Sequence, residues 1–104
     1  GKTIIGQAVH VGSTAMLIFL NCNERLVTPA TSGYIHIPVP NTQVQTEIYK
    51  KKVDNIIAFI ARRTGLSAEQ IRSLDTISLG ATELLLYKIA TKKVPSFTME
   101  MAEP

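Results

Sequence analysis

The stretch over residues 12–38, GSTAMLIFLNCNERLVTPATSGYIHIP, constrains the fold of this chain more than any other. It opens on a small-residue turn at Gly12, continues into an apolar run that closes at Leu20, and reaches two β-favouring segments after a polar break. The turn places Ser13 at the start of a helix, and the alternation of the last segment places His36 on one face of a strand. A serine and a histidine in these positions are two members of a possible nucleophile and base pair.

The periodicity of the apolar residues predicts a single α/β domain. We expect strands at residues 3–11, 26–28 and 33–38, and helices at residues 13–22, 42–64, 68–74 and 81–90. Pro29 is expected to end the pairing of the second strand, since proline has no amide to donate to a sheet. A chain of 104 residues, of which 45% are hydrophobic, can bury one core. Sites on such sheets lie outside the carboxyl ends of the strands, where Ser13 is expected.

Several residues mark the ends of the predicted helices. Ser67 and Gln70 form a capping box at the start of the third helix, and Gly65 is the expected stop of the long one. The lysines at residues 92–93 are expected to follow the last helix, at the negative end of its dipole. Ser13 has an ordinary interpretation as well, as the N-cap of the first helix.

Charge and hydropathy argue against two classes of partner. The net charge of +3 comes mainly from basic clusters at residues 50–52, 62–63 and 92–93. Because no aromatic residues are interleaved within them, solvated helix faces are favoured and no nucleic-acid partner is expected. The longest apolar run, residues 15–20, is far shorter than the roughly 18 residues of a membrane span, so no span is expected.

Cysteine and histidine usage argues against a metal site. A single cysteine, Cys22, cannot form an internal disulfide, which fits a reducing compartment. Its place at the end of an apolar run favours a buried, inert thiol over a reactive one. The two histidines, His10 and His36, are too far apart in the sequence for a zinc-binding motif, and no glycine-rich phosphate loop is present. We therefore expect neither a metal nor a cofactor.

Five short segments occur in an order that resembles a known family. They are Gly12-Ser13-Thr14-Ala15-Met16, Asn23-Glu24-Arg25, Thr28-Pro29, Tyr34-Ile35-His36-Ile37-Pro38 and Ala68-Glu69-Gln70-Ile71. Together they resemble the core of the proteolytic subunit of the Clp protease and of its phage and plasmid relatives. Since the similarity covers residues 4–94, we expect a partial peptidase domain at residues 1–94 and a C-terminal tail at residues 95–104.

The resemblance implies both a fold and a catalytic triad. The fold would be the α/β sheet of Clp subunits and crotonases with flanking helices, without the N-terminal half whose glycine-rich strand supplies oxyanion-hole amides. Ser13 would be the nucleophile, His36 the base and Asp75 the residue that orients the base. One position stays open. Gly6-Gln7-Ala8 resembles a Gly-Gln-Ala motif that, in the family, stands four positions before the nucleophile. Four positions after Gly6 is His10, which would then take the nucleophile's position instead of Ser13.

The function implied by the resemblance is that of an ATP-dependent serine endopeptidase. Its subunits would associate into rings in the cytoplasm, enclose the active sites and receive polypeptide substrates from an AAA+ unfoldase. The resemblance leaves out the N-terminal half that supplies oxyanion-hole amides. Because loss of one such donor costs on the order of 100-fold in rate, the partial domain at residues 1–94 alone should be nearly inactive. One alternative is an inactive paralogue or fragment that serves in assembly. Another is acyl-coenzyme A chemistry on the related crotonase fold, for which no matching acidic pair is present.

Overall fold

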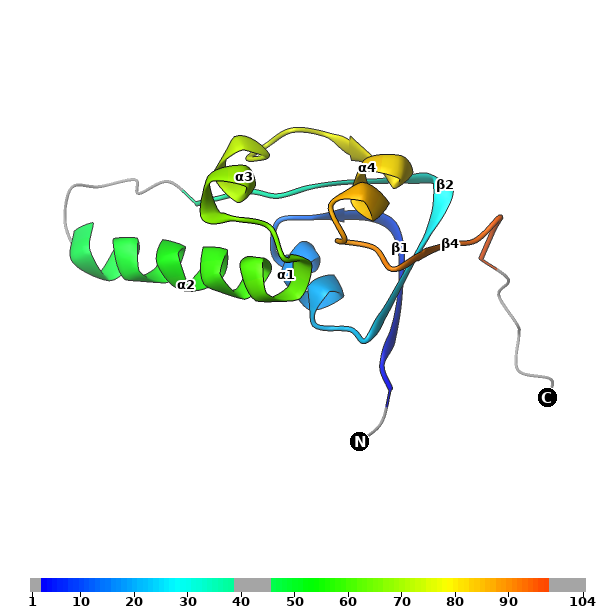
Figure 1. Ribbon diagram of the computed structural model, residues 1–104, viewed down its shortest axis with the longest axis horizontal. Helices are drawn as coiled ribbons and strands as arrows, with labels where there is room; N and C mark the ends of the chain where they lie inside the picture. The colour runs from blue at the N-terminus through cyan, green and yellow to red at the C-terminus, as the bar shows by residue number, and fades with distance from the viewer. Residues whose placement is uncertain (1–2, 39–45, 98–104) are drawn as a thin grey trace.

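The chain folds into a small sheet with helices packed around it. A computed structural model describes residues 3–38 and 46–97 (Figure 1). Its elements, in chain order, are β1 (Ile5–Gly12), α1 (Thr14–Leu20), β2 (Glu24–Tyr34), α2 (Thr46–Thr64), α3 (Ala68–Ser73), β3 (Leu79–Gly80), α4 (Ala81–Leu86) and β4 (Lys92–Lys93). This order of strands and helices confirms the predicted α/β class.

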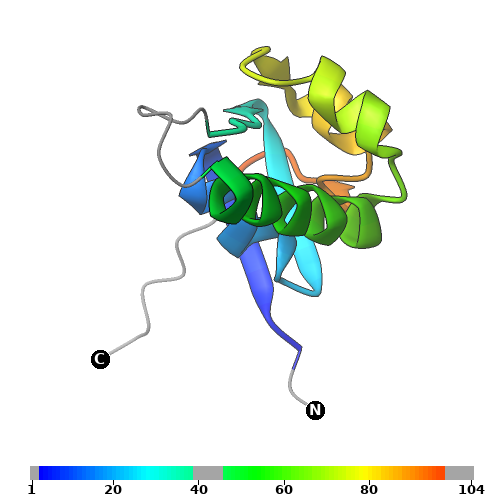
Figure 2. The same ribbon diagram turned by 90° about the vertical axis from the view of Figure 1, so that its left-hand side faces the viewer.

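The long strand β2 organises the sheet. It pairs in parallel with β1, antiparallel with β3 and in parallel with β4. Helix α1 packs on β1, and α4 packs on β2 and β3. Figure 1 shows α1 and α2 below the strands and α3 and α4 above them, and Figure 2 shows α2 crossing in front of the strands.

The prediction of two separate strands on either side of Pro29 is wrong, because β2 runs through this position. The register moves from Ala8 opposite Val27 to His10 opposite Ser32, so β2 holds extra residues here as a bulge. Pro29 lies exposed in that bulge, where no ladder hydrogen bond requires its missing amide. The nearby Thr31 hydroxyl donates to Ala8 O at 2.6 Å and accepts from Thr28 N at 2.8 Å, replacing the interrupted ladder.

The predicted ends of α2 and α3 are confirmed. Gly65 has a φ of 81°, a left-handed conformation that ends α2, and its amide donates to Ala61 O at 2.8 Å. Gln70 N donates to the Ser67 hydroxyl at 3.1 Å while Ser67 N donates to Gln70 Oε1 at 2.9 Å, which completes the capping box. The predicted start of the long helix at residue 42 lies outside the described residues.

The last helix is shorter than predicted. Helix α4 ends at Leu86, and Lys88 follows with a φ of 61°, which turns the chain back toward β2. The lysines at residues 92–93 pair with Leu26 and Val27 as strand β4, so their predicted role at the helix end is wrong. Of the predicted tail, residues 95–97 form neither helix nor strand, and the remainder lies outside the described residues.

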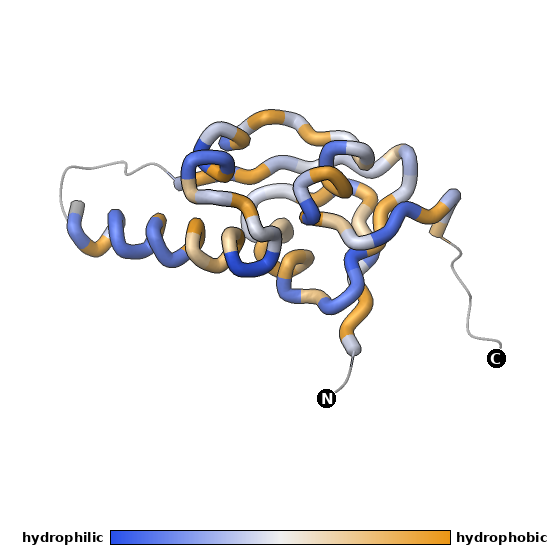
Figure 3. The backbone as a smooth tube through the Cα atoms, in the orientation of Figure 1, coloured by the Kyte–Doolittle hydropathy of each residue, from blue (hydrophilic) through white to orange (hydrophobic). Residues whose placement is uncertain are grey.

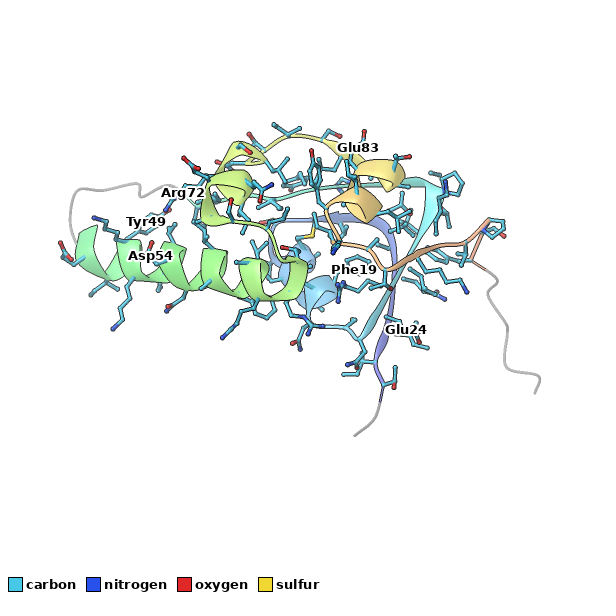
Figure 4. The ribbon with its side chains drawn as sticks, in the orientation of Figure 1. Phe19, Glu24, Tyr49, Asp54, Arg72 and Glu83 are labelled. Atoms are coloured by element: carbon cyan, nitrogen blue, oxygen red, sulfur yellow. The ribbon has the colours of Figure 1, made fainter. Side chains whose placement is uncertain are left out.

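The core lies on both faces of β2. The largest fully buried side chains come from α1, β2, α2, α3, α4 and the segments that follow β2 and α4. They are Met16, Leu20, Val27, Ile35, Ile60, Ile71, Leu84 and Ile89. Figure 3 shows that the first half of α2, which projects beyond the strands, is mainly hydrophilic. Within it, Asp54 faces Arg72 of α3 at 3.9 Å (Figure 4), an exposed ion pair of a kind that contributes little to stability.

A buried arginine ties β2 to the ends of two helices. Arg25 is 6% exposed and donates to Ile89 O at 2.6 Å, to Cys22 O at 2.9 Å and to Lys88 O at 3.1 Å. Burial, and secondly the charge of Arg63, lower the pKa of the Arg25 guanidinium. Its partners are all carbonyls just beyond the C-termini of α1 and α4, which carry partial negative charge.

Candidate active site

Ser13 lies at the turn where β1 passes into α1. Its φ is 53° and its ψ is −127°, a conformation that residues other than glycine rarely adopt. The same sharp strand-to-helix turn exposes the nucleophilic hydroxyl in nucleophile-elbow enzymes. Ser13 is exposed, so its hydroxyl is open to a substrate.

Ser13 occupies the predicted N-cap position of α1, but its side chain does not cap the helix. Its side chain makes no capping hydrogen bond to α1. An N-cap side chain reaches the amides of the first turn from the extended region of the backbone, whereas Ser13 has a positive φ. Capping therefore does not account for a serine at this position.

Gly12 allows the turn to approach β2 closely. A Cβ atom added at Gly12 would overlap three atoms of the Tyr34 ring, on the paired strand. The residue before Ser13 must therefore lack a side chain, unless the ring of Tyr34 moves.

We predict that Gly12→Ala displaces Tyr34 or the Ser13 turn and lowers any reactivity of Ser13 by about 10-fold or more, because small misplacements of reacting groups are costly. The measurement is the rate of Ser13 modification by a fluorophosphonate, followed by mass spectrometry. Gly80→Ala is the matched control, since a Cβ there would meet only the flexible end of Glu83. Equal rates for wild type and Gly12→Ala would show that the turn tolerates a side chain.

His36 lies just beyond the end of β2. Ile35 and Ile37 are buried on one side of the chain and His36 is exposed on the other, as the alternation in the sequence predicts. Ile35 pairs with Asp75 in an isolated parallel bridge, and Thr76 N donates to Ile35 O at 2.7 Å. The loop after α3 is thereby fixed beside the histidine.

Asp75 is held against the backbone next to His36. Its Oδ1 accepts from Ile37 N at 2.9 Å and lies 3.9 Å from His36 Nδ1. The histidine and the carboxylate are partly exposed, at 43% and 33% of their side-chain surfaces. The fold therefore brings the two predicted residues together, within reach of a small rotation of the imidazole.

Ser13 and His36 line the same pocket, between α1, the end of β2 and α2. The pocket has a volume of about 80 Å³. Its other lining residues are Thr14, Met16, Leu17, Ile35, Pro38, Ile56 and Ile60. Within the described part of the chain no hydrogen bond joins Ser13 to His36, whose imidazole lies beside Asp75. A small, mainly apolar pocket beside a hydroxyl and an imidazole suits an apolar substrate side chain.

His10, the other candidate for the nucleophile's position, lies elsewhere. It lies within β1, before the turn, and its Nδ1 is 2.9 Å from the hydroxyl of Ser32. Its ring is 5.8 Å from that of Tyr34, between centroids. His10 lines a separate groove along β1 and not the pocket of Ser13 and His36. The strand-to-helix turn thus carries Ser13.

Comparison with known proteins identifies the fold. No protein-family model and no curated protein matches the sequence. Among solved structures, ClpP1 from Listeria monocytogenes is 25% identical over 91% of this chain with a TM-score of 0.75. The chain has a ClpP-like fold. A point mutant of the Listeria protein matches 90% of the chain at 26% identity with a TM-score of 0.75.

The ClpP-like chain corresponds to a little over half of these proteins. It spans 57% of the length of each Listeria protein. The ClpP protease catalytic domain from Plasmodium falciparum, 20% identical over 98% of this chain with a TM-score of 0.71, has the same fold, and the chain spans 56% of it. These matches confirm the resemblance that the sequence indicated.

Sequence reasoning missed the contribution of α2 to the pocket. The spacing of four residues between Ile56 and Ile60 places them on one face of the helix. Only the packing of α2 against α1 directs that face toward Ser13.

Two classes of feature are missing from residues 3–38 and 46–97. No helix there combines the length and the apolar character that a membrane crossing needs. No group of three or more histidine, cysteine, aspartate or glutamate side chains gathers there as a metal ion would require.

Proposed function

We propose that the chain carries the Ser-His-Asp triad of a serine endopeptidase of the Clp type. Ser13 is the nucleophile, His36 the general base and Asp75 the carboxylate that orients the imidazole. One observation carries the proposal: Ser13, on its strained turn, and His36 line one pocket, and Asp75 is anchored beside the histidine by the amide of Ile37.

The proposed reaction follows from these positions. His36 takes the proton of Ser13 as the hydroxyl oxygen attacks the scissile carbonyl, then returns it to the leaving amine. Asp75, anchored by the amide of Ile37, stabilises the imidazolium that forms in between. Water, activated by the same histidine, releases the acyl group. The amide of Thr14, the residue after the nucleophile, is the candidate first donor to the oxyanion.

The pocket indicates which substrates would fit. Met16, Leu17, Ile56 and Ile60 offer an apolar surface beside Ser13. Its volume of about 80 Å³ accepts a side chain of moderate size rather than a folded segment. The substrate class that we propose is therefore an unfolded polypeptide with an apolar residue at the cleaved bond.

Assembly and energy supply are further parts of the proposal. In the wider protein, subunits would form rings in the cytoplasm that enclose these sites, and an AAA+ unfoldase would deliver substrates at the expense of ATP. Ile48, on the projecting half of α2, is 59% exposed, and such a residue suits contact with another subunit.

Site mapping with a fluorophosphonate tests the proposal. Ser32 lies within hydrogen-bond distance of the other histidine, His10, which makes an internal comparison. We expect the label on Ser13, which lines the same pocket as His36. Ser13→Ala should abolish labelling and Ser32→Ala should leave it unchanged. Labelling at Ser32, or at neither residue, would contradict the proposal.

A second candidate is a catalytically inactive ClpP-like paralogue or fragment that serves in assembly. The separation of 3.9 Å between His36 and Asp75, longer than a hydrogen bond, favours this function. An unlabelled chain that still associates with other subunits would support it.

A further inference from the structure

The loop that carries Asp75 contains a residue in a strained conformation. Among residues 3–38 and 46–97, the residues other than glycine with a positive φ are Ser13, Thr76 and Lys88, at 53°, 61° and 61°. Ser13 is the candidate nucleophile, and Thr76 directly follows Asp75 in the chain. Threonine is branched at Cβ, and a positive φ is a rare and costly conformation for such a residue. Strain of this kind persists only where neighbouring contacts impose it.

Two hydrogen bonds hold Thr76 in this conformation. Its amide donates to Ile35 O at 2.7 Å, beside the isolated parallel bridge between Ile35 and Asp75. Its hydroxyl donates to the main-chain carbonyl of Asp75, also at 2.7 Å. Both bonds therefore stabilise a left-handed turn immediately after the candidate carboxylate.

The turn decides which acceptor the amide of Ile37 meets. If the parallel ladder continued past the bridge of Ile35 with Asp75, the Ile37 amide would donate to the main-chain carbonyl of Thr76. Instead the chain turns away at Thr76, and Ile37 N donates to Asp75 Oδ1 at 2.9 Å. The same carboxylate oxygen lies 3.9 Å from His36 Nδ1. The turn thus leaves free the amide that anchors the carboxylate beside the imidazole.

We propose that Thr76 is a positioning residue of the candidate triad. Its left-handed turn ends the ladder after one bridge and assigns the Ile37 amide to the carboxylate of Asp75. Thr76 acts through Asp75, and not on the substrate. Its effect on the reactivity of Ser13 rests on the proposed function, whereas the placement of the carboxylate does not.

NMR couplings across hydrogen bonds test the placement directly. Wild type should show a coupling between the amide nitrogen of Ile37 and the carboxylate carbon of Asp75. Thr76→Val disfavours a positive φ and lacks the hydroxyl, so this coupling should be lost. Thr76→Asn should retain it, because asparagine tolerates the left-handed region. Thr82→Val on α4, where the threonine is also exposed, is the matched control and should retain it.

The rate of fluorophosphonate labelling at Ser13 tests the consequence. Thr76→Val should slow labelling by about 10-fold or more, since small misplacements of reacting groups are costly, and Thr76→Asn by less than about 3-fold. In an Asp75→Ala background, Thr76→Val should change the rate by less than about 2-fold, because Thr76 acts only through Asp75. An equal slowing by Thr76→Val in both backgrounds would overturn the proposal.

The couplings also separate this proposal from the proposed function. A coupling that persists in Thr76→Val, or is lost in Thr76→Asn, overturns the positioning role. A wild-type chain in which Ser13 is unreactive would contradict the proposed function, while the couplings would still decide whether Thr76 places Asp75. If circular dichroism shows that Thr76→Val does not fold, Thr76→Ala replaces it with the same expected results, because alanine also disfavours a positive φ.

Discussion

Replacing His36 by alanine is expected to slow fluorophosphonate labelling of Ser13 by about 1,000-fold or more. A positioned general base contributes about 100- to 10,000-fold, and members of a triad act as a unit, so loss of the base removes most of the activation of the serine. The measurement is the second-order rate of labelling, determined by mass spectrometry of the peptide that contains Ser13.

The chain offers a matched control for this prediction. His10 also lies beside a serine, Ser32, at 2.9 Å, but in a different groove. His10→Ala should change the labelling of Ser13 by less than about 3-fold, because His10 does not line the pocket of Ser13. If the two alanine variants reduce labelling equally, the base is not His36 and the triad must be reassigned.

Replacing Arg25 by methionine is expected to lower the free energy of unfolding by about 3 kcal/mol. Methionine retains much of the volume but cannot donate, so Ile89 O and Lys88 O lose the guanidinium as donor, whereas Cys22 O keeps the bond from Arg63. Relief of a buried charge offsets part of the loss, since burial already lowers the pKa of Arg25. For a domain of this size the change corresponds to a decrease in Tm of about 15 °C, measurable by circular dichroism.

Two variants separate charge from geometry at this position. Arg25→Lys retains the positive charge but cannot reach three carbonyls in different directions, so it should recover less than half of the lost stability. Arg63→Met removes the bonds to Leu20 O and Cys22 O from a half-buried side chain, and should cost about 1 kcal/mol. A stability of Arg25→Met within about 0.5 kcal/mol of wild type would mean that water or relaxation satisfies these carbonyls.

The sequence alone predicted the local features of the fold well. The capping box of Ser67 and Gln70 and the stop at Gly65 depend on residues within one or two turns, and both are present. The alternation of burial around His36 also holds, with Ile35 and Ile37 buried and His36 exposed. The predicted strand to residue 38 is too long, however, because β2 ends at Tyr34. Where the prediction failed, at Pro29 and at residues 92–93, distant partners decided the structure.

For the candidate site, sequence patterns proposed the residues but not their geometry. Nothing local distinguishes Ser13 from an N-cap serine, because the positive φ arises where a strand paired with β2 meets a helix packed on it. Likewise, Asp75 becomes a partner of His36 only through the bridge between Ile35 and the loop after α3.

Local chemistry therefore determined the α/β class, the end of α2 and the capped start of α3, since each depends on neighbours in sequence. The resemblance to Clp subunits suggested the candidate residues Ser13, His36 and Asp75. Tertiary structure decided that β2 is continuous, that residues 92–93 form a strand and that α2 closes the pocket. The reason is physical. Hydrogen bonds across a sheet and the burial of a helix face join residues far apart in the chain, and their free energy outweighs the weaker preferences of single residues.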